Sequence, residues 1–120
     1  MSQAKKWLGI SPITAQSIQG DANTAITAAG TTLATATDLT NTFNIVTGGS
    51  DSQGVQLDTG VIGDSQIVYN ATLVSIKVYP SSSSAKINQI TAGAAHILAP
   101  QTACVYWVAS ATQHIANLSA

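Results

Sequence analysis

The sequence predicts an all-β fold: a compact antiparallel β-sandwich or barrel-like domain preceded by an extended N-terminal arm. Glycines interrupt residues 48–63 at short intervals, which leaves room for strands but not for helices. Several runs in the second half alternate apolar and polar side chains, as a half-buried strand does. Many short strands at this spacing are typical of sandwiches and barrels.

The first 20 residues differ from the rest of the chain. They follow neither a helical nor a strand period, so we predict an extended arm over residues 1–20 and a β-domain over residues 21–120. A frayed terminus is the alternative. The arm, however, holds large apolar side chains that favour lying on a surface, namely Trp7, Leu8, Ile10, Ile13 and Ile18.

The segment that follows the arm is rich in Ala and Thr. Residues 31–37 alternate small apolar and β-branched side chains, which favours a strand. A helix is the alternative, because Ile26, Ala29 and Leu33 fall at helical spacing. Gly30 and the many threonines each reduce helix stability, by tenths of a kcal/mol to about 1 kcal/mol. We therefore predict a strand here.

Alternation predicts the remaining strands, which cover residues 54–58, 66–70, 72–79, 86–90, 94–99, 103–109 and 113–118. Val55 and Leu57 share one face of the first of these strands. Asn70 and Ala71 predict a hairpin turn between the second and the third.

The predicted core consists of apolar residues from two of these strands: Val74, Ile76, Val78, Val105 and Trp107. Cys104 is the only cysteine, so an intrachain disulfide is excluded. Because it lies within an apolar run, we predict a buried and unreactive thiol.

Charged residues make up only 8% of the chain, against about 25% in average soluble proteins. The formal net charge of −1 offers no electrostatic attraction to nucleic acid. No apolar run approaches the ~18–20 residues of a membrane span, and none is typical of a signal peptide, so we expect a soluble chain with no membrane partner. Uncharged polar side chains are less costly to desolvate than ions, which favours a surface covered by protein partners over a plain neutral β-domain.

Residue patterns typical of catalysis or metal binding are absent from the sequence. His96 and His114 lie beside apolar residues, and no serine stands in a nucleophile elbow. One cysteine and two separated histidines do not give zinc-ligand spacing, and Asp51, Asp58 and Asp64 do not form a calcium loop. We therefore predict no enzyme activity, no catalytic residue, no metal and no cofactor.

The order of several short motifs resembles a β-module of small virion proteins of tailed bacteriophages, which include capsid decoration (cement) proteins and pieces of fibres. The motifs are GTTLATATDLT at 30–40, NIVT at 44–47, GVQL at 54–57, VYN at 68–70, IKVYP at 76–80 and IN at 87–88. The resemblance covers roughly residues 27–110. One departure is Asp58, where the module often has proline. The resemblance implies a virion structural protein that assembles as a homotrimer.

From this resemblance we expect a decoration protein on the outer capsid surface of the virion, with itself and the major capsid protein as partners. The arm would dock on the shell through Lys5, Lys6, Trp7, Leu8, Ile10 and Ile13. A tail-fibre or head-fibre module that contributes to host attachment is the alternative. A small carbohydrate-binding domain is a third reading, which requires exposed aromatic residues such as Trp107.

Overall fold

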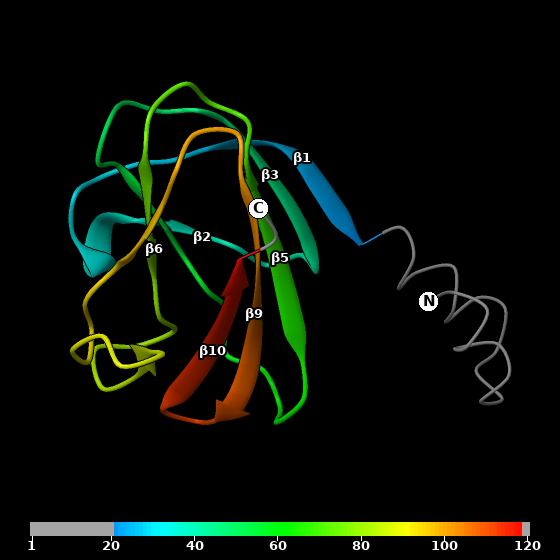
Figure 1. Ribbon diagram of the computed structural model, residues 1–120, viewed down its shortest axis with the longest axis vertical. Helices are drawn as coiled ribbons and strands as arrows, with labels where there is room; N and C mark the ends of the chain where they lie inside the picture. Colours follow the sequence, from blue (N-terminus) through cyan, green and yellow to red (C-terminus); the bar gives the residue numbers. More distant parts are fainter. Residues whose placement is uncertain (1–20, 119–120) are drawn as a thin grey trace, which may run out of the picture.

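The computed structural model describes residues 21–118, which form ten strands and one short 3₁₀ turn (Figure 1). The elements are β1 (Ala22–Thr27), η1 (Leu33–Thr35), β2 (Thr37–Asp38), β3 (Phe43–Gly48), β4 (Gly54–Gln56), β5 (Ser65–Asn70), β6 (Ile76–Tyr79), β7 (Lys86–Ile87), β8 (His96–Leu98), β9 (Ala103–Ser110) and β10 (Gln113–Leu118). They build a six-stranded sheet in the order β1-β3-β5-β9-β10-β7 and a four-stranded sheet in the order β2-β4-β6-β8. The all-β prediction is confirmed.

From β1 to β6 the chain winds as a solenoid, because successive strands alternate between the two sheets. Each strand pairs in parallel with the strand one coil later: β1 with β3, β3 with β5, β2 with β4, and β4 with β6. The register sets the coil length, since Ala22 lies opposite Phe43, and Phe43 lies opposite Ile67. Coils of this length are typical of repeat proteins that stack one supersecondary unit on the next.

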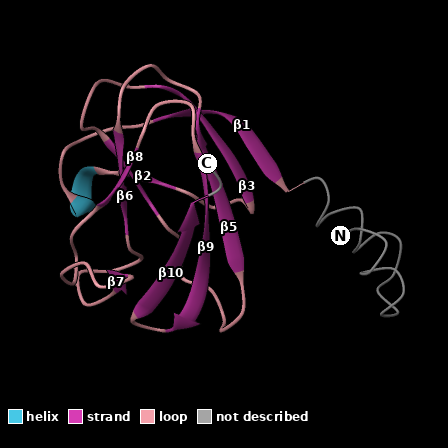
Figure 2. Ribbon diagram, viewed as in Figure 1, coloured by secondary structure: helices cyan, strands magenta, loops and turns pink. Residues whose placement is uncertain are grey.

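After β6 the winding stops and most new pairs are antiparallel. Strand β9 lies between β5 and β10 and is antiparallel to both, and β8 is antiparallel to β6. Strand β7 adds to the far edge of the six-stranded sheet, parallel to β10 (Figure 2). These strands cover the last coil, as the atypical terminal units of a solenoid do.

The prediction of an antiparallel sandwich or barrel therefore has to be corrected to a solenoid-like arrangement. Alternation along a strand shows which side chains are buried, but it is the same for parallel and antiparallel neighbours. The predicted hairpin at Asn70–Ala71 is wrong for the same reason, because β5 and β6 belong to different sheets.

The predicted strand over residues 31–37 is also wrong, except at its last residue. Gly30 has a φ of 66°, which turns the chain, and η1 follows. The hydroxyls of Thr32 and Thr35 lie 2.8 Å apart, and the Thr32 amide donates to the Thr35 hydroxyl at 3.3 Å. Threonine side chains that bond the local backbone in this way compete with strand pairing.

The core lies between the two sheets, with Val46, Val68, Ile76, Val78 and Tyr106 among its fully buried members. The buried thiol predicted for Cys104 is confirmed, as is the shared buried face of Val55 and Leu57. Burial raises the pKa of the Cys104 thiol, which keeps it protonated.

Three of the five predicted core residues are not fully buried. Val74 and Val105 are only partly covered, and Trp107 is 44% exposed. The reason lies in the phase of β9, where Cys104, Tyr106 and Val108 point into the core and the residues between them point out. An apolar run that spans both faces of a strand does not reveal which half is buried.

A buried asparagine joins the two sheets at the end of β5. The Asn70 side-chain amide donates to the carbonyls of Val74, Leu98 and Ala99 at 2.8, 3.1 and 3.2 Å. Its Oδ1 accepts from the backbone amide of Thr72 at 3.0 Å and from the Thr72 hydroxyl at 2.6 Å. Asn70 thus satisfies the backbone where the chain leaves one sheet for the other.

Candidate functional site

The residues predicted to dock on a capsid lie outside the residues that the structure describes. They are Lys5, Lys6, Trp7, Leu8, Ile10 and Ile13. The described chain begins at Asp21, directly before the edge strand β1 of the six-stranded sheet. Two other features of residues 21–118 are therefore considered as sites: an apolar sheet face and a polar pocket.

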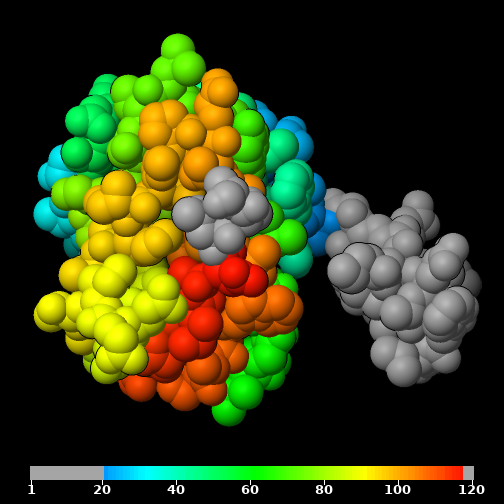
Figure 3. Space-filling model, viewed as in Figure 1, coloured from blue at the N-terminus to red at the C-terminus, as the bar shows by residue number. Residues whose placement is uncertain are grey.

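The outward side of the six-stranded sheet carries an apolar stripe, which we call the outer face. Its members point away from the core on four adjacent strands: Phe43, Ile45, Ile67, Tyr69, Val105, Trp107 and Ile115. Phe43, Trp107 and Ile115 are 37%, 44% and 42% exposed. Strands β9 and β10, orange to red, lie at the surface of the molecule (Figure 3).

The strand register makes this stripe continuous. Ile67 lies between Phe43 on one neighbouring strand and Val105 on the other. Trp107 lies between Ser65 and Ile115 in the same way. Side chains that are directly opposite across a sheet are about 4.5–5.5 Å apart at Cβ, so these residues contact one another laterally.

The outer face carries no charge. Strands β1, β3, β5, β9 and β10 contain no Lys, Arg, Asp or Glu. The one charged residue in the strands of this sheet is Lys86, on the edge strand β7. A charge-free apolar face is the usual composition of the centre of a protein–protein interface.

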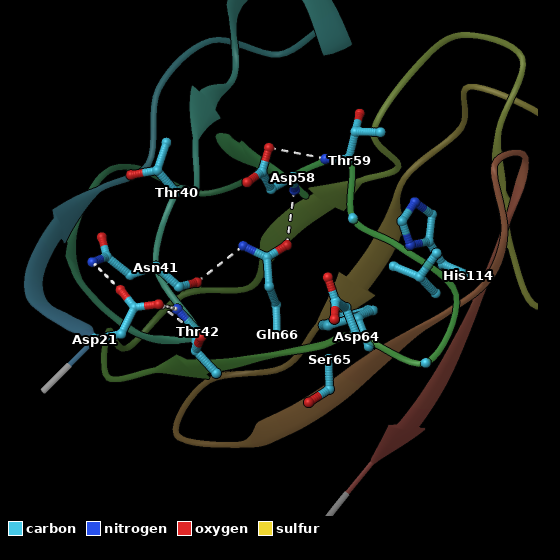
Figure 4. A pocket seen from close by; sticks show the side chains of 14 residues that line it. Asp21, Thr40, Asn41, Thr42, Asp58, Thr59, Asp64, Ser65, Gln66 and His114 are labelled. Atoms are coloured by element: carbon cyan, nitrogen blue, oxygen red, sulfur yellow. Dashed lines mark hydrogen bonds between the residues drawn. The ribbon is translucent and has the colours of Figure 1, made fainter. Parts of the chain in front are cut away.

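A polar pocket of about 460 Å³ lies where the chain crosses from the four-stranded to the six-stranded sheet (Figure 4). Its walls come mainly from the β2–β3 and β4–β5 turns, which are neighbours because the coils stack. The pocket-lining side chains with oxygen or nitrogen atoms are Asp21, Thr40, Asn41, Thr42, Asp58, Thr59, Asp64, Ser65, Gln66, Tyr106 and His114.

The carboxylates of the pocket bond to the turns themselves. Asp21 accepts from the Thr42 hydroxyl and the Asn41 amide, at 2.8 and 2.7 Å, and these bonds, the first above all, lower the pKa of Asp21. Asp64 accepts from the backbone amide of Val61 at 3.1 Å, and Asp58 from that of Thr59 at 2.9 Å.

Gln66 joins the two turns. Its amide nitrogen donates to the carbonyls of Leu39 and Asn41 at 3.2 and 3.0 Å, and its Oε1 accepts from the Asp58 amide at 2.8 Å. These polar groups therefore hold successive coils of the solenoid together.

His114 is buried, and its contacts bear on the question of catalysis. Its Nε2 lies 3.1 Å from the Ser81 hydroxyl and accepts from the Ser81 backbone amide at 3.3 Å. Burial lowers the pKa of His114. A triad also needs a carboxylate on the other ring nitrogen, and within residues 21–118 no carboxylate bonds to this ring. The contact anchors the β6–β7 loop to β10.

His96 lies outside this pocket and bonds to the core. Its Nδ1 is 2.8 Å from the Tyr106 hydroxyl, and the two rings pack edge to face at a centroid distance of 5.7 Å. Burial lowers the pKa of His96 and raises that of Tyr106. Among the described residues no group of three or more His, Cys, Asp or Glu is placed to hold a metal ion. No described helix is long and apolar enough to span a bilayer.

The two histidines predict a pH-dependent stability. Because burial lowers the pKa of His96 and of His114 below 6.5, the unfolded chain binds protons that the folded chain does not. The histidine contribution is therefore fully present above pH 6.5 and is lost as the pH falls from about 6.5 through the lowered values. Thermal melts between pH 8 and pH 5 should show a falling midpoint, with a smaller slope in the His96→Gln/His114→Gln variant. Equal slopes in the two proteins would contradict this prediction.

No protein family, curated protein or solved structure matches this chain. The functional argument therefore depends on the residues and their geometry. Sequence reasoning missed the outer face, although the alternation that buries Tyr106 and Val108 places Val105 and Trp107 on the opposite side. It missed the pocket because the two turns meet only when the coils are stacked in parallel.

Proposed function

We propose that this protein is a bacteriophage capsid decoration protein, a non-enzymatic structural protein that binds the outer shell as a homotrimer. The observation that supports a structural, protein-binding role most directly is the outer face, which is apolar, partly exposed and free of charge. Contiguous apolar patches of several hundred Å² on a small protein mark interaction surfaces. The link to a phage shell comes from the motif resemblance at residues 30–88.

The mechanism is mechanical. A trimer holds three arms of residues 1–20, and binding by several weak arms at once gives an avidity far above that of one arm. Trp7, Leu8 and Ile10 are the apolar anchors, since interface energy concentrates in buried aromatic and apolar residues. Lys5 and Lys6 add rim contacts where the shell is acidic. Bound trimers then tie neighbouring capsid subunits together.

A fibre module is the alternative within the same class, in which the trimer presents a distal surface to a host receptor. The exposure of Trp107 favours a third function, carbohydrate binding, because sugars stack on exposed aromatic rings. The neighbours of Trp107 across the strands are Ser65 and Ile115, so one side of the ring meets an apolar side chain rather than hydrogen-bonding groups. This setting suits a protein surface better than a sugar.

Deleting residues 1–20 tests the docking role. The truncated protein should fold, because residues 21–118 contain the core, but its occupancy on undecorated capsids should fall at least about tenfold when three anchors are lost together. Occupancy is measured by sedimenting capsids with bound protein and quantifying the pellet.

The matched control for this deletion is the full chain with Lys5→Ala and Lys6→Ala, which removes charge but keeps the apolar anchors. It should reduce occupancy less than the deletion does and more strongly at low salt than at high salt. Full decoration by the truncated protein would show that the β-domain carries the capsid contact.

A further inference from the structure

We infer that the outer face of the six-stranded sheet is the surface through which copies of this chain associate. The inference deepens the proposed function, on whose oligomer it rests, by assigning the contact to named residues. The occupant of the outer face is a second copy of the same face, with Trp107, Ile115 and Phe43 as the most exposed contacts. Charge and area support this assignment.

The distribution of charge selects this surface. The described residues include all five aspartates but only two lysines, Lys77 and Lys86, so two copies repel each other over most of their surface. The outer face lies on strands without any charge, and two such faces meet without repulsion or ion desolvation. It is therefore the part of the described surface where self-association is least opposed.

The area of the sheet is sufficient. Six strands about 4.8 Å apart, each about 20 Å long, present roughly 500 Å² per copy, so two faces bury on the order of 1,000 Å². That total reaches the lower bound of about 1,000 Å² for a specific interface. Association of moderate strength, in the micromolar range, is expected for an apolar contact of this size.

The other exposed apolar residues offer no comparable surface. Val61 and Ile62 lie together in the β4–β5 loop, and Leu73 lies in the β5–β6 loop. Ile97 is on β8, at the edge of the four-stranded sheet, opposite the charged Lys77. Single exposed apolar side chains of this kind are common on monomeric proteins.

Placing a charge in the outer face tests the inference. In full-length Ile115→Asp a carboxylate would be buried without a partner at the contact, so the dissociation constant of the oligomer should rise at least about 30-fold. The matched control is Ile97→Asp, the same substitution at an exposed strand isoleucine of the other sheet, where Lys77 lies opposite. Mass is measured by light scattering and sedimentation over about 1–100 μM, and folding by circular dichroism.

Wild type and Ile97→Asp should be oligomeric while Ile115→Asp is monomeric and folded. Should Ile115→Asp fail to fold, Asn117→Asp, nearly isosteric and exposed on the same face, should weaken the oligomer instead. A monomeric wild type, or equal masses for both aspartate variants, would overturn the inference. A monomer that still coats capsids would overturn this inference alone, and an oligomer that coats none would overturn the proposed function alone.

Discussion

Tyr106→Ala is expected to lower the free energy of unfolding by about 3–5 kcal/mol, the usual cost of deleting a large buried aromatic side chain. Tyr106 is 1% exposed and belongs to the cluster that joins the two sheets. Its loss also removes the 2.8 Å contact with His96 Nδ1. Because a domain of this size has only about 5–15 kcal/mol of stability, the variant should be close to unfolding at 37 °C.

Its neighbour Trp107 provides the matched control, since it lies on the same strand but on the outer face. Trp107→Ala should cost no more than about 1.5 kcal/mol, because the ring is 44% exposed and leaves no core cavity. Both values come from urea unfolding at a protein concentration where only monomer is present. A larger loss for Trp107→Ala than for Tyr106→Ala would show that the phase of β9 is reversed.

Asn70→Asp is expected to cost about 3–5 kcal/mol at pH 7, although it changes only one side-chain group. The amide that donates to three carbonyls becomes a carboxylate that faces them, and the buried charge has no partner. Burial would raise the pKa of the new carboxyl, so its cost relative to wild type should shrink as the pH falls and the acid protonates.

The control for this variant is Asn117→Asp, the same change at an exposed position on β10. It should change the unfolding free energy of the monomer by less than about 0.5 kcal/mol. The comparison is made by urea unfolding at pH 7 and pH 5. If Asn70→Asp unfolds like wild type at pH 7, the network at the end of β5 does not hold the sheets together.

The strand content could be predicted from the sequence, but the connections between strands could not. Period-2 alternation located β9 and β10, and the bounds of β10 agree with the predicted residues 113–118. Parallel stacking left only a weak signal, the spacing of 21 residues from Ala22 to Phe43, because the coils share few identical residues. Short apolar runs do not specify a partner strand, so the sandwich was the wrong arrangement.

The candidate sites were less accessible to sequence reasoning. The outer face depends on which side of each strand is buried, and in the run from Cys104 to Val108 every residue is apolar. Only the packing of Tyr106 against the other sheet decides the phase. The proposed docking residues stay a prediction, since residues 1–20 lie outside the described part of the chain.

The position of the chain in purified phage particles tests the central proposal most directly. Cryo-electron microscopy of particles, with and without an antibody fragment against this chain, gives both its location and its copy number. A decoration protein should appear in many copies over the outer shell, as trimers at symmetric positions between capsid subunits. A handful of copies at the tail, or none on the shell, would contradict the decoration function, and the tail position would favour the fibre module.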